Sequence, residues 1–418
     1  MKQKTIKSGV KNIKKQFHHF IFVLLLFMIG CSPEEKKQDN VLYNVGISEA
    51  FGQDVNVNIS EIAEGKIEYV PLDSDKKYLL AQNPDFYLNG NEIIAFAKNQ
   101  IYVFDRTSGR FLREIGHYGN DPGGYNKVVQ TFPFDEEKKL VYTSGWDPKS
   151  YYRYSADGSF SDKVTAYSID KEGDIMDNVF GEIVTSIAPL NDTCFVGYVW
   201  NIDGKQEAKL IVFNENNHRI KIFPQYNHFD YDIKRDGISV YGWNAKYYQL
   251  DNQLHFYERF TDTVYTVSMD TLLPKFVLNS GETSTTNATD YTKSKGEVPF
   301  LPIENIFESN RYLFFKIRKP KENFESEYYY GYFDKKSQIT KVSNSIGGFE
   351  NDINNFIPFR FVSSNQNNEI VGYYDAYEVK LWFDENPDKS AELPEEFQKL
   401  KNIKETDNPV VMIAKLKE

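Results

Sequence analysis

The sequence predicts an all-β fold: a six-bladed β-propeller, closed by pairing of its N- and C-terminal strands, with one short helix near the C-terminus. Three observations support this prediction. Aromatic residues make up 16% of the 418 residues, and rings at that density pack well on pleated sheets. Short alternating or apolar runs recur between turn residues, while long helical periodicity is almost absent. One strand-and-turn unit also recurs along the chain.

The clearest unit spans residues 91–116, NEIIAFAKNQIYVFDRTSGRFLREIG. It contains three strand-like runs, IIAFA, IYVF and FLREI, separated by KNQ and DRTSG. In the second turn Asp105 and Ser108 can bond local backbone groups, and Gly109 permits a positive φ. The unit therefore predicts a meander of antiparallel strands.

The middle of this unit is echoed four times. IYVFDRTSG at 101–109 is followed by YYRYSADGS (151–159), LIVFNENNH (210–218), VYTVSMDT (264–271) and YYGYFDKKS (329–337). The equivalent positions Phe104, Tyr154, Phe213, Val267 and Phe333 are 50, 59, 54 and 66 residues apart. These spacings suit a four-stranded blade with its loops.

A sixth blade is predicted from the two ends of the repeat region. EGKIEYVPLD at 64–73 and NPVVMIAKLK at 408–417 are strand-like, and neither has a sequential partner. Their pairing would close a ring and remove its open edges. The predicted helix is AELPEEFQKLKN, 391–402, in which Leu393, Phe397 and Leu400 share a face. Its mixed charges favour docking on the last blade over membrane binding.

The first thirty residues have the pattern of an export signal. Six lysines precede Gln16, and the apolar run from Phe20 to Ile29 is too short to span a bilayer. The sequence MIGC at 28–31 resembles a bacterial lipoprotein signal, in which the cysteine becomes the first mature residue and carries the lipid. We expect lipid attachment at Cys31; the alternative is an uncleaved anchor with an incidental cysteine.

These patterns divide the chain into three parts. We expect a lipoprotein signal peptide over 1–30, a lipidated tether and N-terminal segment over 31–59, and the propeller over 60–418. Acidic Glu34 and Glu35 resemble the short signal that sends some Bacteroides-type lipoproteins to the outer face of the outer membrane. The expected location is thus the outer membrane, on its periplasmic or cell-surface face, with the lipid anchor as the contact to the membrane.

Charge argues against one class of partner. Residues 1–30 contribute +6, so subtracting them from the −11 of the whole chain leaves −17 on the remainder. Such a surface repels phosphate backbones, and no nucleic-acid partner is expected.

Residues 101–128, IYVFDRTSGRFLREIGHYGNDPGGYNKV, resemble the first blade and connector of the six-bladed β-propeller lipoproteins related to NHL-repeat propellers. DTVYTV at 262–267 and the terminal run NPVVMIAKLK are similar to other elements of that family. The resemblance spans about residue 60 to residue 418 and implies a cell-envelope propeller without a defined reaction. Gly124 stands where the connector usually has Glu, so any role of that glutamate is not carried over.

The glycine-rich stretch REIGHYGNDPGGYN, 113–126, has two interpretations. A phosphate-binding loop would require a helix directly after it. The following residues are β-like, so we predict instead a crossing from the outer strand of one blade to the inner strand of the next. Gly116, Gly119, Gly123 and Gly124 would permit its backbone angles.

Such a crossing lies on the same propeller face as the loop SGWDPKS, 144–150. The possible ligand face is therefore His117, Tyr118, Trp146, Asp147 and Lys149, which could converge at one mouth of the central channel. The alternative is that Trp146 packs between blades and the charges are solvated.

Enzymatic chemistry has little support, and no catalytic residue, cofactor or metal is predicted. Four histidines follow Cys31 without zinc-site spacing, at His117, His218, His228 and His255. HFDYD at 228–232 could gather carboxylates beside an imidazole, with a polar crossing loop as the alternative. Cys194, in an apolar stretch, is expected to be buried.

The sequence thus favours a binding or scaffolding module for a partner protein or an extracellular glycan or peptide. The alternative is a propeller enzyme of the lyase or hydrolase type with its site in the central channel. A tight cluster of ionisable groups in the channel would favour the enzyme.

Overall fold

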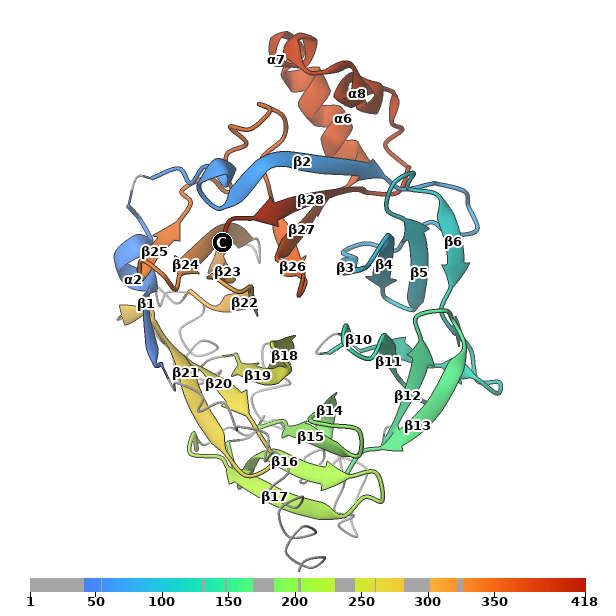
Figure 1. The fold of residues 1–418 in the computed structure, drawn as a ribbon, viewed down its shortest axis with the longest axis vertical. Helices are drawn as coiled ribbons and strands as arrows, with labels where there is room; N and C mark the ends of the chain where they lie inside the picture. Colours follow the sequence, from blue (N-terminus) through green and yellow to red (C-terminus); the bar gives the residue numbers. More distant parts are fainter. Residues whose placement is uncertain are drawn as a thin grey trace, which may run out of the picture. The chain divides into compact units, whose positions relative to one another are not determined.

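The computed structural model describes residues 41–53, 55–129, 132–146, 149–167, 184–201, 204–229, 245–259, 261–281, 301–321 and 326–418. Within the unit from Leu42 to Glu418, these residues form six sheets arranged as blades around a central axis (Figure 1). The predicted six-bladed β-propeller is confirmed.

Each of the first three blades is an antiparallel meander that runs from the innermost to the outermost strand. Blade one contains β3 (Asp85–Asn89), β4 (Glu92–Ala97), β5 (Gln100–Asp105) and β6 (Phe111–Glu114). Blade two contains β10 (Phe134–Asp135), β11 (Leu140–Ser144), β12 (Ser150–Ser155) and β13 (Phe160–Thr165), and β9 (Lys127–Val128) also pairs with β11. Blade three contains β14 (Val184–Pro189), β15 (Cys194–Val199), β16 (Ala208–Asn214) and β17 (Arg219–Pro224).

Of the other three blades, blades four and six also take a strand from the N-terminal part of the chain. Blade four contains β18 (Ala245–Leu250), β19 (Gln253–Glu258), β20 (Thr263–Val267) and β21 (Leu272–Asn279). Blade five contains β22 (Ile303–Glu308), β23 (Tyr312–Pro320), β24 (Ser326–Asp334) and β25 (Ile339–Val342). Blade six contains β26 (Phe361–Ser364), β27 (Glu369–Tyr374), β28 (Val410–Leu416) and, from the N-terminal part, β2 (Ala63–Pro71).

The predicted closure of the ring is confirmed. β2 pairs antiparallel with β28, with Tyr69 opposite Met412 and Pro71 opposite Val410. β28 is therefore an inner member of the sheet, bonded to β27 on one side and to β2 on the other. Blade six couples the two ends of the propeller sequence.

The predicted repeat positions all lie on the third strand of a blade. Phe104, Tyr154, Phe213, Val267 and Phe333 belong to β5, β12, β16, β20 and β24. Four of them are at most 1% exposed, and Val267 is 4% exposed. The repeat was recognisable because each third strand packs between two neighbouring blades and ends in a turn.

An N-terminal segment joins the propeller at a place that the repeats did not indicate. β1 (Tyr43–Gly46) pairs in parallel with β21 and forms a fifth, outer strand on blade four. α2 (Ile47–Ala50) and the 3-10 helix η1 (Ile59–Glu61) follow before β2 begins. The four residues of β1 are too few to carry a periodic signal.

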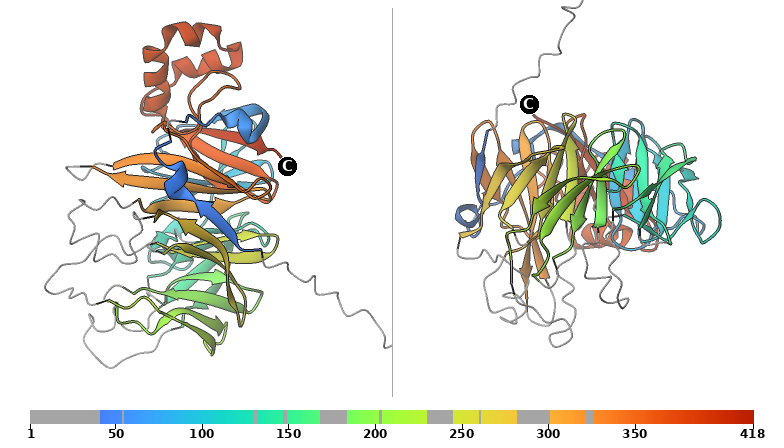
Figure 2. Two further views of the ribbon diagram at one scale, coloured as in Figure 1. Left: turned by 90° about the vertical axis from the view of Figure 1, so that its left-hand side faces the viewer. Right: turned by 90° about the horizontal axis from the view of Figure 1, so that it is seen from below.

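A helical insertion separates β27 from β28 (Figures 1 and 2). It consists of α6 (Ala376–Glu385), α7 (Pro387–Glu392), α8 (Glu395–Gln398) and the 3-10 helix η5 (Lys399–Asn402). The predicted single helix over 391–402 is thus α8 with η5, while α6 and α7 were not predicted. Leu393, Phe397 and Leu400 are buried together against blade six, as expected from their spacing.

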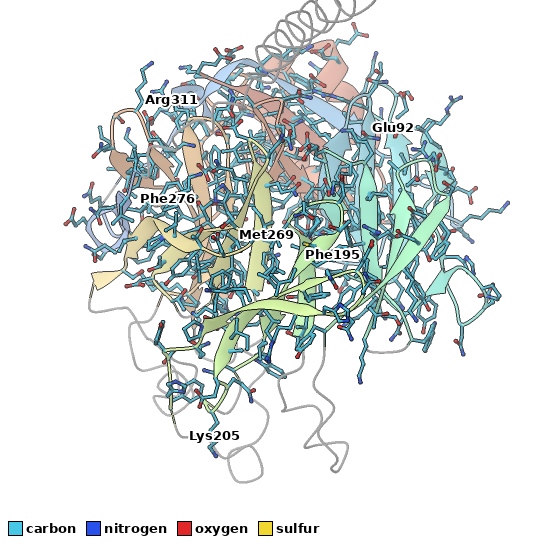
Figure 3. The ribbon with its side chains drawn as sticks, turned by 60° about the horizontal axis from the view of Figure 1, so that its bottom comes forward. Glu92, Phe195, Lys205, Met269, Phe276 and Arg311 are labelled. Carbon is cyan, nitrogen blue, oxygen red and sulfur yellow. The ribbon has the colours of Figure 1, made fainter. Side chains whose placement is uncertain are left out.

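The core lies between adjacent blades. Phe195 in blade three and Phe276 in blade four are fully buried (Figure 3). Close backbone contact also joins blades: a side chain on Gly109 (φ +70°) would place its Cβ 2.0 Å from the carbonyl oxygen of Pro71. A glycine is therefore required where blade one meets β2.

Candidate functional site

The structure brings two of the predicted ligand-face residues, Tyr118 and Trp146, into contact, and His117 directly precedes Tyr118 in β7. The rings of Tyr118 and Trp146 lie 5.8 Å apart between centroids, and both side chains are partly exposed. Trp146 Nε1 donates to the carbonyl of Gly119 at 2.6 Å, and His117 Nε2 hydrogen-bonds the Asp121 carboxylate at 2.8 Å.

The other two residues of the predicted ligand face are Asp147 and Lys149. Lys149 directly precedes β12, and Asp147 lies outside the described residues, as does Cys31. Ligand binding by His117, Tyr118, Trp146, Asp147 and Lys149 stays a prediction.

The glycine-rich stretch is a crossing between blades. β7 (His117–Tyr118) pairs in parallel with β8 (Gly124–Tyr125), and β9 follows, so no helix begins where a phosphate-binding loop would need one. Gly116 (φ +58°) and Gly123 (φ +83°) adopt left-handed angles. The carbonyl of Gly123 accepts a hydrogen bond from the Tyr154 hydroxyl at 2.6 Å.

The central channel contains a small cavity of about 70 Å³. Its lining comes mainly from β3, β10, β18, β22 and β26, and it includes Glu136, Lys246 and Glu308. A single water needs roughly 10–15 Å³ of such volume, whereas pockets for organic ligands span about 300–1,000 Å³. The cavity therefore has room for a few water molecules and not for a glycan or peptide.

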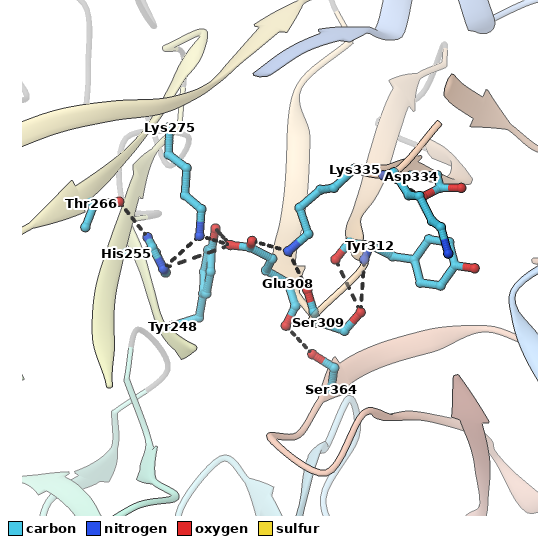
Figure 4. Close-up of polar contacts among 11 residues, drawn as sticks. Tyr248, His255, Thr266, Lys275, Glu308, Ser309, Tyr312, Asp334, Lys335 and Ser364 are labelled. Carbon is cyan, nitrogen blue, oxygen red and sulfur yellow. Dashed lines mark hydrogen bonds and ion pairs between the residues drawn. The ribbon is translucent and has the colours of Figure 1, made fainter. Parts of the chain in front are cut away.

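Beside this cavity, the Glu308 carboxylate joins blades four and five (Figure 4). Its side chain is fully buried. One oxygen accepts from Lys275 Nζ at 2.9 Å and from the Tyr248 hydroxyl at 3.1 Å, and the other accepts from Lys335 Nζ at 2.6 Å. Burial opposes ionisation of Glu308, but Lys335 and Lys275 outweigh it and hold the pKa of the carboxyl below its usual value.

His255 completes this cluster from β19, and it too is fully buried. Its Nε2 lies 3.2 Å from Lys275 Nζ, which can only donate, so Nε2 accepts and Nδ1 carries the hydrogen that faces Thr266 Oγ1 at 3.2 Å. Burial lowers the pKa of His255 to about 3. The positive charges of the nearby lysines also lower this pKa, whereas the negative charge of Glu308 raises it. The imidazole is therefore neutral at pH 7.

The ionisable groups of this cluster form hydrogen bonds and ion pairs with one another. Glu308 accepts from three donors and His255 is held between two neighbours. The cluster ties two blades together and offers no group positioned toward a substrate-sized space. The sequence could not show it, because its members are scattered from residue 248 to residue 335 on separate strands.

A much larger space lies along the outer strand of blade six. This groove has a volume of about 810 Å³, within the range of about 300–1,000 Å³ that is usual for ligand sites. Its floor is the six consecutive residues Lys66–Pro71 of β2. Turns of blade one provide a polar wall with Asn91, Arg106 and Thr107. The segment from α8 onward provides the opposite wall, which is partly apolar and consists of Glu396, Phe397, Lys399, Leu400, Asn402, Ile403 and Asp407.

Polar contacts fix the blade-one wall. Arg106 Nη2 pairs with Glu68 on β2 at 3.0 Å and with Glu369 on β27 at 2.7 Å. Thr107, next in the chain, is exposed and donates to Asn91 at 3.3 Å. An arginine held by two carboxylates keeps this turn in place beside the strand.

Aromatic packing fixes the helical wall. The Tyr69 ring lies 5.0 Å from Phe397 and 5.2 Å from Phe356 between centroids. The Tyr69 hydroxyl accepts from Asn351 Nδ2 at 2.8 Å. The sequence identified both β2 and the helix, but it could not reveal that they border one groove, since more than 300 residues separate them.

Within the described part of the chain, no three His, Cys, Asp or Glu side chains are grouped so as to hold a metal ion. His228 Nδ1 lies 3.3 Å from the carbonyl of Gly204, whereas Asp230 and Asp232 lie outside the described residues. Cys194 is buried, as predicted. No helix among the described residues combines the length and apolar character needed to cross a membrane.

Comparison with solved structures supports the fold. A protein of Bacteroides fragilis described as exported is 17% identical, with a TM-score of 0.63 over 90% of this chain and 99% of that one. A DUF4221 family member from Bacteroides vulgatus is 11% identical, with a TM-score of 0.50 over 88% of this chain and all of that one. A comparison with curated proteins finds no match.

A family model described as "Domain of unknown function (DUF4934)" matches residues 42–415. The match includes β1, which pairs with blade four, and every strand of the six blades except the last residue of β28. This six-bladed propeller therefore belongs to the DUF4934 family.

Proposed function

We propose that this protein is a lipid-anchored binding protein of the cell envelope that holds a partner protein, or an extracellular peptide or glycan, in the groove along β2. The groove volume of about 810 Å³ carries the proposal, because the channel cavity of about 70 Å³ is too small for such ligands. A lyase or hydrolase reaction in the channel has less support, since the ionisable groups of the Glu308 cluster satisfy one another.

The proposed location rests on the N-terminal pattern. The short apolar run ending in MIGC at 28–31 supports export and lipid attachment at Cys31. The similar structure from Bacteroides fragilis is described as an exported protein, which agrees with this location.

The test is a binding screen on residues 31–418 carrying Cys31→Ser, with a glycan array and a display library of random peptides as probes. Asn402→Trp and Thr107→Trp place a bulky ring on either wall of the groove, at exposed positions. Both variants should lose binding while melting like the parent. Lys401→Trp is the matched control, because Lys401 is exposed, adjoins Asn402 and does not line the groove.

The predicted ligand face provides a second comparison. A double variant with His117→Ala and Trp146→Ala should keep the binding that the groove variants lose. If the double variant loses binding and the groove variants keep it, the ligand site lies on that face. If no probe binds the parent, the proposed function is wrong.

A further inference from the structure

Besides its volume, the groove has a second notable feature: β2, which forms its floor, has one open edge. Leu72 N–H donates to the carbonyl of Pro409 on the β28 side. Because antiparallel partners bond at every second residue, Val70 and Glu68 also face β28. Ile67, Tyr69 and Pro71 therefore direct their backbone groups to the opposite, open side.

At one end this open side is already occupied. The Pro71 carbonyl lies against Gly109, and Asp73 N–H donates to the carbonyl of Gly109 at 2.9 Å. Nearer the middle of the strand, no described group hydrogen-bonds the backbone N–H or C=O of Tyr69. An unpaired strand edge of this kind is a template for another strand.

The dimensions of the groove match one added strand. Six floor residues at about 3.3 Å each give a length of roughly 20 Å. A peptide strand of six residues has the same length, and the groove volume of about 810 Å³ lies within the range of about 300–1,000 Å³ that is usual for ligand sites.

The two walls differ in chemistry. Glu68 turns toward Arg106 on the polar blade-one wall, while Tyr69 turns toward Phe397 on the helical wall, where Leu400 and Ile403 add apolar surface. Successive side chains of an extended peptide would meet these walls alternately.

We propose that the groove binds an extended peptide with alternating apolar and polar residues, which adds to β2 as a further strand of blade six. This inference rests on the proposed function and names its ligand. The backbone groups of Ile67 and Tyr69 bond the peptide, and side chains at every second peptide position contact Phe397, Leu400 and Ile403. Strand addition of this type takes affinity from the main chain and selectivity from alternate side chains.

The test uses a ten-residue peptide selected from a library of alternating apolar and polar sequences, with binding measured by calorimetry. Each residue of the peptide is N-methylated in turn. Methylation should weaken binding at least about tenfold at every second central position, and less than twofold at the positions between. Uniform effects, or none, would overturn strand addition.

Hydrogen exchange gives a second measurement inside the same strand. Peptide binding should slow exchange of the Ile67 and Tyr69 amides, while those of Glu68 and Val70, already bonded to β28, should stay unchanged. If the peptide binds and Asn402→Trp blocks it, but Tyr69 exchange does not slow, the peptide occupies the groove without pairing to β2. The inference then fails and the proposed function stands.

The same variants and probes distinguish two other possible occupants of the groove, a second copy of the chain and a glycan. If a second copy of the chain fills the groove, the parent will sediment as a dimer and Asn402→Trp as a monomer, which overturns the peptide proposal. If glycans bind in a groove-dependent manner and no peptide does, the proposed function stands without strand addition. If neither class binds, both proposals fail.

Discussion

His255 makes the stability of blades four and five depend on pH. Its folded pKa is about 3 because of burial, against about 6.5 in an unfolded chain. Between these values the unfolded state binds a proton that the folded state does not, so stability falls as pH falls from 6.5 toward 3. pH 5 lies about 1.5 pH units below 6.5. At about 1.36 kcal/mol per unit, the free energy of unfolding should be lower by roughly 2 kcal/mol at pH 5.

The perturbation that isolates this effect is His255→Gln. A glutamine carries no charge at any pH, and it offers an oxygen to Lys275 and an amide N–H to Thr266. Urea unfolding should be measured at pH 7.5 and pH 5 for the parent and the variant. Between the two conditions the parent should lose about 2 kcal/mol more than the variant, because the other titrating groups are common to both.

Two results would show that His255 is not neutral in the folded protein. Equal losses in parent and variant would mean that His255 is not kept neutral by the fold. An imidazole NMR signal of His255 that titrates between pH 7.5 and pH 5 in the folded protein would also contradict the argument.

Three further outcomes follow from the fold and the N-terminal pattern. Deleting residues 409–418 removes β28 from between β27 and β2, so cooperative thermal unfolding should be lost; a truncated protein that melts like the parent would contradict the closure of the ring. Gly90→Ala should lower the free energy of unfolding by about 1 kcal/mol, because only its positive φ is strained. Gly109→Ala should lower it further, because its Cβ also meets the Pro71 carbonyl. Similar urea midpoints for the two variants would refute this. Radiolabelled fatty acid should enter the parent in cells and not Cys31→Ser, and equal labelling would refute lipid attachment.

Much of the fold could be predicted because it is repeated. Each third strand carries a buried aromatic or aliphatic residue followed by a turn, and Phe104 and Phe333 mark that pattern in blades one and five. α6 was not predicted: AYEVKLWFDE is rich in aromatic and branched residues and directly follows a strand, so its composition does not distinguish a helix from a strand. A capping box between Asp375 and Glu378 starts the helix, and Val379 and Phe383 bury its inner face.

The groove and the Glu308 cluster could not be predicted for a different reason. Both depend on which blades become neighbours and on how far apart their strands lie. Lys275 and Lys335 are ordinary charged residues in the sequence, and only the ring places them on either side of one carboxylate. Local patterns report which residues are buried, whereas such sites depend on contacts between distant segments.

The short strand β1 gives the propeller a mechanical property. Its parallel ladder with β21 runs from Tyr43 to Gly46, Tyr43 stacks on Phe276 with ring centroids 5.2 Å apart, and the N–H of Gly46 donates to Thr340 of blade five at 3.0 Å. In a chain tethered through its N-terminus, tension would reach these four residues before it reached β2. β1 would therefore have to separate from β21 before a pulling force reached the β2–β28 pairing that closes the ring.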